Sequence, residues 1–310
     1  MAQVSIRDVT LRDGLQLVST IMPTPDKVKL ARTLLELGVP EIEIGAVVRP
    51  DRVPPMADTL DVVRQLDHAT LARSWVWVPN LTGVRRAVEA GAVNLQYVLS
   101  VSESHNRANV GCSVQTSLDG LAESVRYAAE HGARLQLGLA TAFSCPFEGP
   151  TPPAAVLAAV EDARAAEVAS LVLCDTIGQA VPDQVAALTG RVRRVAGRRG
   201  LVFHGHDTWG LGVANSIAAI AAGADTVDAA LGGLGGCPFA PGASGNTALE
   251  DVLYALRPDW LTPQRFRALV GHGRALLGQL DQPVRSRAAE GAARSPGSHV
   301  WAVAAGQSSP

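Results

Sequence analysis

Two histidines separated by one residue are the first sign of chemistry in this sequence. His204 and His206 lie in the stretch FHGHDTWGLG, directly behind an apolar run. If residues 201–207 form a strand, both imidazoles point to the same face, because side chains alternate along a strand. Two histidines aimed at one point are typical of a metal site. A polar strand end that is hydrogen-bonded to its neighbours is an equal alternative on this stretch alone.

The elements that must position these histidines are visible as short β-branched runs, each followed by a helical pattern. The predicted strands are residues 4–10, 41–46, 71–78, 95–101, 134–140, 171–176, 201–207 and 226–233. Two helices begin with Thr-Pro, and we expect Thr24 and Thr151 to be their N-caps. Eight strand–helix units in about 255 residues indicate an α/β protein with a (β/α)8 TIM barrel. A doubly wound sheet is the alternative, but it needs a GxGxxG turn that DVTLRDGLQ lacks.

The pattern also predicts how the chain is divided. A short helical extension is expected beyond residue 260, so that residues 1–283 form one barrel domain with a C-terminal helix. Residues 284–310 are rich in Ser, Gly, Ala and Arg and lack apolar periodicity. We therefore expect residues 284–310 to be a polar, flexible tail.

Composition excludes several classes of function. The 310 residues carry a net charge of −2 without a long basic run, so nucleic acid is not an expected partner. No apolar stretch is long enough to span a bilayer, and the start of the chain does not resemble a secretion signal. The four cysteines form no CxxC pair, which fits a reducing cytoplasm.

Polar residues gather where a barrel carries its chemistry, at the carboxyl ends of the strands. These residues are Arg12, Asp13, Glu43, Asp175, His204, His206, Cys237, Ser244 and Asn246. Asp13, the two histidines and Asn246 make a mixed oxygen and nitrogen set that suits Mg²⁺ or Mn²⁺, and also Zn²⁺ or Co²⁺. Alternatively, Asp175 caps the turn that follows it, and Glu43 pairs with Arg12 inside the barrel.

The loop at residues 232–246 contains six glycines together with Cys237. A flexible linker is one interpretation, and a lid that carries a reactive thiol explains the cysteine better. The remaining cysteines are interpreted as small buried hydrophobes, and the remaining histidines as surface or structural residues. These are Cys112, Cys145 and Cys174, and His68, His105, His131, His272 and His299.

Several motifs together resemble the 3-hydroxy-3-methylglutaryl-CoA lyases, which belong to the DRE-TIM metallolyase superfamily. The motifs are RDGLQ at 12–16, VPPMAD at 53–58, CPFEG at 145–149, CDTIGQ at 174–179, FHGHDTWG at 203–210 and GGLGGCPFAPGASGNTALEDVLY at 232–254. The resemblance extends from about residue 4 to residue 280. Its cysteine loop distinguishes the lyases from the condensing synthases of the superfamily.

The resemblance implies a divalent cation and a retro-Claisen cleavage of 3-hydroxy-3-methylglutaryl-CoA or a close analogue to acetyl-CoA and an oxo acid. It implies metal ligands at Asp13, His204, His206 and Asn246, and catalytic roles for Arg12, Cys237, Asp175, Glu43 and His204. Arg12 matches the arginine that stabilises the enolate, and Cys237 matches a lid cysteine used in proton transfer. The implied partner is a small acyl-CoA or hydroxy acid, and the expected assembly is a homodimer.

Departures from the family pattern concern the substrate. Ser19, Ala46 and Gln136 stand where the family places groups that hold the CoA phosphates or the substrate carboxylate. We therefore expect the reaction type to be retained, with the substrate open between the ordinary thioester and a related compound. An acetyl-CoA-dependent condensing enzyme or aldolase of the same superfamily is one alternative. A barrel that binds acyl-CoA without turnover is another.

Overall fold

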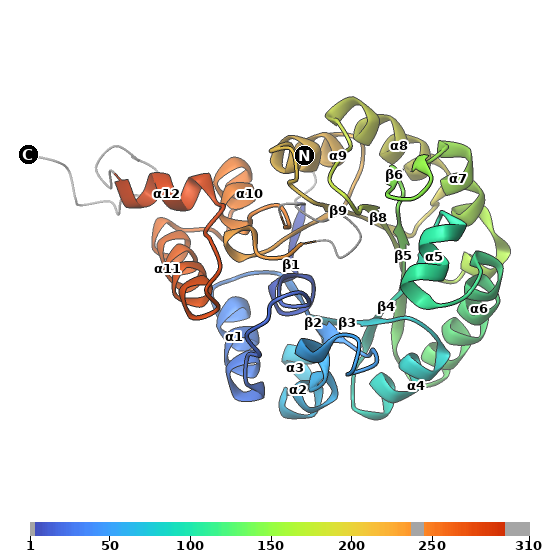
Figure 1. Cartoon of the computed structure of the whole chain (residues 1–310), viewed down its shortest axis with the longest axis horizontal. Coiled ribbons are helices and arrows are strands. Elements are labelled where there is room, and N and C mark those ends of the chain that lie inside the picture. Colours follow the sequence, from blue (N-terminus) through green and yellow to red (C-terminus); the bar gives the residue numbers. More distant parts are fainter. Residues whose placement is uncertain (1–3, 237–244, 295–310) are drawn as a thin grey trace, which may run out of the picture.

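The computed structural model describes residues 4–236 and 245–294, in which eight parallel strands close into a barrel with helices around it (Figure 1). The barrel strands are β1 Ser5–Asp8, β2 Glu41–Ala46, β3 Ser74–Val78, β4 Asn94–Ser100, β5 Arg134–Ala140, β8 Ser170–Asp175, β9 Gly200–Gly205 and β10 Thr226–Ala229. Each overlaps one of the predicted strands, and the (β/α)8 barrel is confirmed. A small antiparallel hairpin, β6 Ser144–Cys145 with β7 Gly149–Pro150, lies outside the barrel sheet.

The helices follow the strands in alternation. They are α1 Thr24–Glu36, α2 Thr59–Gln65, α3 His68–Leu71, α4 Leu81–Glu89, α5 Glu103–Val110, α6 Val114–Glu130, α7 Pro153–Glu161, α8 Pro182–Val195, α9 Gly212–Ala221, α10 Leu249–Leu256, α11 Pro263–Gln279 and α12 Arg287–Arg294. Short helical turns are η1 Thr10–Gly14, η2 Pro54–Met56, η3 Ala163–Ala165 and η4 Leu231–Gly233. Among the described residues, no helix has the length and apolar character needed to cross a membrane.

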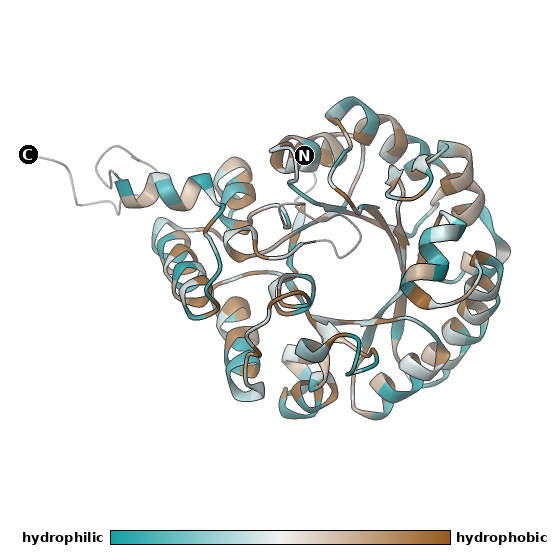
Figure 2. Ribbon diagram, viewed as in Figure 1, coloured by the Kyte–Doolittle hydropathy of each residue, from teal (hydrophilic) through white to brown (hydrophobic). Residues whose placement is uncertain are grey.

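The strands are buried on both faces, but the two faces differ in chemistry. The outer face packs on the helices through apolar residues such as Ile6, Ile42 and Leu137, and Figure 2 shows hydrophilic colour mainly on the outer sides of the helices. The barrel interior instead holds charges: Arg7 on β1 donates from Nε and Nη2 to the carboxylate of Asp228 on β10, both at 2.8 Å. Buried charges must be paired, and here the pairing joins neighbouring strands.

Neither Thr24 nor Thr151 is the N-cap that the sequence predicted, because each hydroxyl donates a hydrogen bond to a residue outside its own helix. Helix α1 begins at Thr24 itself, and Thr24 Oγ1 donates to Asp58 Oδ2 at 2.7 Å. Helix α7 begins at Pro153, and Thr151 Oγ1 donates to the carbonyl oxygen of Thr141 at 2.7 Å. Proline in the first turn pre-sets the helical backbone without a side-chain cap.

The C-terminal part contains one helix more than the composition predicted. The expected helical extension is α11, but α12 follows within the segment that we expected to be a flexible tail. Asp251 on α10 holds the start of α12, because its carboxylate accepts hydrogen bonds from Ser286 Oγ and from the backbone N–H groups of Arg287 and Ala288. Residues 287–294 therefore form a helix that the composition did not predict, and residues 295–310 lie outside the described residues.

Candidate active site

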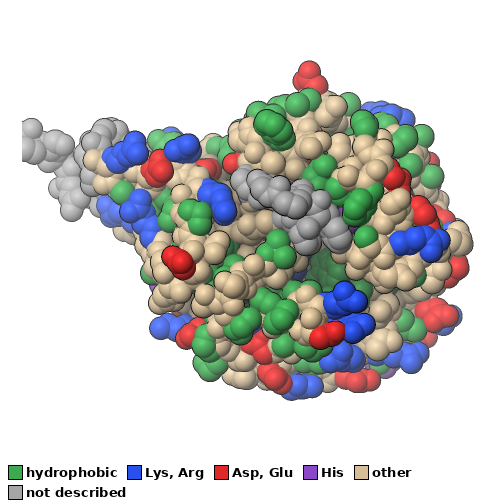
Figure 3. Space-filling view, viewed as in Figure 1, with side chains coloured by type: hydrophobic (Ala, Val, Ile, Leu, Met, Phe, Trp, Pro, Cys, Tyr) green, Lys and Arg blue, Asp and Glu red, His purple; other side chains and the backbone are tan. Residues whose placement is uncertain are grey.

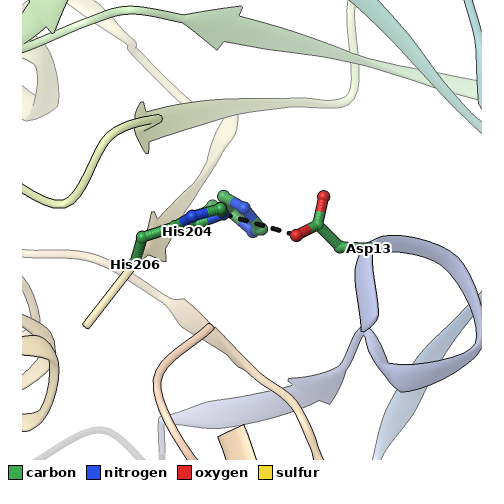
Figure 4. Close-up of side chains that lie close together, drawn as sticks. All are labelled: Asp13, His204 and His206. Carbon is green, nitrogen blue, oxygen red and sulfur yellow. Dashed lines mark ion pairs between the residues drawn. The ribbon is translucent and has the colours of Figure 1, made fainter. Parts of the chain in front are cut away.

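Three side chains that are far apart in sequence meet at one end of the barrel (Figure 4). Asp13 lies on the turn η1 that follows β1, His204 on β9, and His206 just beyond β9. Their potential ligand atoms all lie within 4.8 Å of one another, and His206 Nε2 is 3.3 Å from Asp13 Oδ2. All three are buried. This group has the nitrogen and oxygen donors, and the spacing, that can hold a divalent cation.

A carboxylate behind His204 fixes its ring. His204 Nδ1 lies 3.0 Å from Asp228 Oδ2, and Arg7 holds the same carboxylate from the other side. Since Nδ1 is engaged, Nε2 is the nitrogen that His204 offers to the cluster. Burial favours the neutral ring, but the carboxylates of Asp228 and Asp13 outweigh it and raise the pKa of His204. Sequence reasoning missed Arg7 and Asp228, and the available signal was their charge within two predicted strands.

Asn246, the last residue of the glycine-rich loop at 232–246, contacts Asp13 of the cluster. Its amide nitrogen donates to Asp13 Oδ2 and to the carbonyl oxygen of Leu234, both at 2.9 Å. A side chain at Gly235 would place its Cβ 2.5 Å from the amide nitrogen of Asn246, and the backbone there has a φ of +130°. Glycine at 235 therefore makes room for Asn246 beside Asp13.

Arg12 lies between two carboxylates beside the cluster. Its Nε donates to Glu43 Oε2 at 2.6 Å, and its Nη1 pairs with Asp13 Oδ1. Burial alone would raise the pKa of Asp13, but the guanidinium of Arg12 and the neighbouring histidines hold it well below its usual range. The pairing of Glu43 with Arg12 is the alternative that the sequence left open, so Glu43 fixes the guanidinium from inside the barrel.

Asp175 caps the turn that follows it, which is the alternative role that the sequence left open for this residue. Its two carboxylate oxygens accept the backbone N–H groups of Gln179 and Ala180, each at 3.1 Å. This caps the turn between β8 and α8. Burial raises the pKa of Asp175. The side chain is fully buried and is not among those that line the cavity beside the cluster.

A cavity of about 100 Å³ opens beside the cluster. Its lining consists of Arg12, Asp13, Gln16, Trp77, Gln96, Val98, His105, Asn109, Ala140, Cys174, Thr176, His204, His206 and Gly236. Figure 3 shows the surface hollowed near the middle of the barrel, with both apolar and charged side chains beside the hollow. A larger cavity of about 610 Å³ lies between α10 and α12; it touches Asn246 but none of Asp13, His204 and His206. We assign the chemistry to the smaller cavity because it contains the ionisable cluster.

The remaining cysteines and histidines differ in their burial. Cys145 and Cys174 are buried as expected, while Cys112 is half-buried. Burial raises the pKa of the Cys174 thiol, which lines the cavity as a neutral group. His105 is buried, pairs with Ser100 and lines the cavity, which fits the structural role that the sequence left open for it. Cys237, Ser244 and His299 lie outside the described residues.

Known proteins resemble this chain over most of its length. Residues 3–265 match the family model described as HMGL-like. The chain is 38% identical over 253 residues to the mitochondrial hydroxymethylglutaryl-CoA lyase of Arabidopsis thaliana, which is 82% of this chain and 54%, about half, of that protein. It is 39% identical to the (R)-citramalyl-CoA lyase of Chloroflexus aurantiacus, covering 82% of this chain and 83% of that protein. An HMG-CoA lyase from Acinetobacter baumannii, solved in complex with coenzyme A and 3-methylmalate, matches with a TM-score of 0.86 and 36% identity over 93% of this chain and 94% of that one.

Proposed function

This chain belongs to the HMGL-like family, and we propose that it is a divalent-metal-dependent carbon–carbon lyase. It cleaves a 3-hydroxyacyl-CoA, either 3-hydroxy-3-methylglutaryl-CoA or a close analogue, to acetyl-CoA and an oxo acid. The observation that carries the proposal is the buried cluster of Asp13, His204 and His206 next to Arg12. Relatives that act on two different 3-hydroxyacyl thioesters support the reaction class.

The donor set fits a cation such as Mg²⁺ or Mn²⁺. Asp13, His204 and His206 supply three ligand atoms within 4.8 Å of one another. Asn246 is held beside Asp13, and we propose its amide oxygen as a further ligand. When bound, the cation polarises the substrate carbonyl and lowers the pKa of the tertiary hydroxyl.

Residues of the chain supply the other chemical functions, which are charge stabilisation, exclusion of water and proton delivery. Arg12 is held by Glu43 and Asp13, so its positive charge is fixed where the thioester enolate develops. The burial of the site keeps water away from that enolate. We propose that Cys237, which follows the cavity-lining Gly236 in the chain, delivers the proton to the carbanion, with His204 as the alternative donor. Asp175 acts on the site through the β8–α8 turn that it caps.

The substrate is a hydroxy acid attached to CoA, or a close relative of one. The A. baumannii lyase holds coenzyme A and 3-methylmalate, which supports this class. Gln136 lies inside the barrel, where it accepts a hydrogen bond from Ser170 Oγ at 3.0 Å and pairs with Gln96. An amide network therefore occupies this part of the interior, and Arg7 joins it by donating to Gln96 Oε1 at 3.3 Å. We place the reaction in the cytoplasm, which the free thiols of Cys112, Cys145 and Cys174 support.

The test measures acetyl-CoA released from 3-hydroxy-3-methylglutaryl-CoA and citramalyl-CoA, after chelation and again after addition of Mg²⁺ or Mn²⁺. We expect release only with metal. We expect His206→Ala to lower both the turnover and the affinity for Mn²⁺, which calorimetry measures, by ten-fold or more, on the order of the loss of a metal ligand's contribution. His131→Ala, on the exposed end of α6, is the matched control and should change neither. Release that persists without metal, or CoA formation from acetyl-CoA and an oxo acid without any cleavage, would contradict the proposal.

A further inference from the structure

Thr10 is a buried polar residue that takes no part in the proposed reaction. It is the first residue of the turn η1, which also carries Arg12 and Asp13. Its backbone N–H donates to Asp8 Oδ1 at 2.9 Å, and its hydroxyl donates to Asp8 Oδ2 at 2.8 Å. The same hydroxyl accepts the backbone N–H of Leu231 at 2.8 Å. One side chain therefore joins the end of β1 to the turn η4, which follows β10.

The chemistry of the partners fixes the direction of both hydroxyl bonds. A backbone N–H can only donate, so the oxygen of Thr10 accepts from Leu231 and its proton goes to another acceptor. Asp8 is that acceptor. The position therefore needs a small side chain that accepts on one side and donates on the other. Serine and threonine have such a group, whereas valine has nearly the shape of threonine but neither a donor nor an acceptor.

The turns η1 and η4 are joined at both ends. At one end, Thr10 bonds to Leu231, the first residue of η4. At the other end, Asn246 bridges the turns, because its amide nitrogen donates to Asp13 Oδ2 and to the carbonyl oxygen of Leu234, both at 2.9 Å. The bridge through Asn246 contains Asp13, a member of the metal cluster. The bridge through Thr10 contains no member of the cluster.

The two turns also pack closely between these bridges. A Cβ added at Gly14 would lie 3.3 Å from Leu234 Cδ2, and one added at Gly235 would lie 3.3 Å from the carbonyl oxygen of Asp13. Within residues 4–236 and 245–294, the hydroxyl of Thr10 makes the only side-chain hydrogen bond between η1 and η4. Small changes at this hydroxyl are therefore transmitted to the carboxylate of Asp13, because a close-packed interior has little room to absorb them.

We propose that Thr10 is a positioning residue of the metal centre: by fixing η1 against η4, its hydroxyl holds Asp13 where His206 and Asn246 can share a cation with it. Without the hydroxyl, the buried N–H of Leu231 loses its partner. Such a group is costly to leave unpaired, so the turns shift to find it another partner, and Asp13 shifts with η1. This inference rests on the proposed metal-dependent function.

The experiment removes the hydroxyl and keeps the shape, with Thr10→Val. The readout is the Kd for Mn²⁺, measured by calorimetry at a temperature at which the variant is folded. We expect the affinity to fall about ten-fold or more, the range for groups that orient metal ligands. Thr10→Ser restores the hydroxyl and should bind Mn²⁺ within roughly three-fold of the wild type. A residue that only stabilised the fold would lower the Tm of the valine variant and leave its Mn²⁺ affinity unchanged.

Thr189→Val is the matched control, because Thr189 is equally buried and lies on α8, outside the barrel strands. It should leave the Mn²⁺ affinity unchanged. If Thr10→Val does not fold, Thr10→Cys takes its place, since a thiol donates and accepts only weakly, and it should lower the affinity by roughly three-fold or more.

The outcomes separate the two proposals. A wild type that binds no Mn²⁺ overturns the metal-dependent function, and the role of Thr10 with it. If the wild type binds Mn²⁺ and the folded valine or cysteine variant binds it equally well, the role of Thr10 alone is overturned. A serine variant that binds as weakly as the valine variant also overturns that role, because the hydroxyl would then not be the group that matters.

Discussion

At the residue scale, the site is built from two rows of buried polar and charged side chains that bond to one another. Arg7, Asp228 and His204 form one row, and Glu43, Arg12 and Asp13 form a second. Each row ends at a residue of the metal cluster. Because these groups are desolvated, removing one member leaves its partner uncompensated, which costs about 3–5 kcal/mol for a buried pair. The rows therefore fix the ligand geometry before any cation is bound.

Asp228→Asn should weaken metal binding without removing a ligand. The amide cannot hold the imidazole of His204 as the carboxylate does, and loss of such a supporting group typically costs 10–100-fold in metal affinity. Calorimetric titration with Mn²⁺ measures this. Asp61→Asn is the matched control, because Asp61 is exposed on α2 and pairs with Arg64 on the same helix. Wild-type affinity in a folded Asp228→Asn variant would show that His204 needs no support.

Sequence reasoning found the three residues of the candidate metal cluster but not the residues that support them, for a physical reason. His204 and His206 are two apart in a strand, and that spacing alone puts them on one face. Arg7 and Asp228 are 221 positions apart, and they meet because the first and last barrel strands pair. Barrel strands are buried on both faces, so no apolar–polar alternation reveals which residues point inward.

At the scale of elements, the turn η4 and helix α10 hold the two ends of the glycine-rich loop together. Gly245 packs so closely on Gly233 and Gly235 that a Cβ there would lie 2.3 Å from the carbonyl oxygen of Gly233. Glu250 on α10 accepts the backbone N–H of Gly232 with both oxygens, at 3.0 and 2.8 Å. The loop ends were predictable from their glycines, but the buried glutamate that ties them was not, because it resembles an ordinary acidic residue in a first helical turn.

The stability of the fold should depend on pH through Glu250. Burial raises its pKa from 4.5 to about 8, so between these values the folded state keeps a proton that the unfolded state has released. The free energy of unfolding therefore falls as pH rises through this window. Glu250→Gln lacks this titration, and we expect it to gain roughly 5 °C in Tm relative to the wild type between pH 5 and pH 8, on the order of 2 kcal/mol. Thermal unfolding at both pH values measures it; the exposed Glu130→Gln is the control. A constant Tm difference would contradict the assignment.

At the scale of the whole molecule, the barrel is completed by helices that come after its last strand. Composition suggested a flexible tail from residue 284 because the segment RAAEGAAR offers little apolar surface. The carboxylate of Asp251, on α10, caps and so positions α12. Ser286 and Ala289 are fully buried. Such a cap is invisible to local periodicity, and this explains why the barrel could be predicted and its last helix could not.

Removing α12 should destabilise the whole domain. We compare a chain that ends at residue 284 with one that ends at residue 294, so that the difference reports α12 and the two residues that lead into it. The shorter chain loses three hydrogen bonds to the Asp251 carboxylate and the buried contacts of Ser286 and Ala289. That is a loss of about 2–4 kcal/mol, and we expect the Tm to fall by roughly 5–10 °C. Asp251→Asn in the chain ending at 294 should reproduce part of this fall, because an amide accepts hydrogen bonds less strongly than a carboxylate. Equal melting temperatures for the two truncated chains would mean that α12 contributes nothing to the barrel.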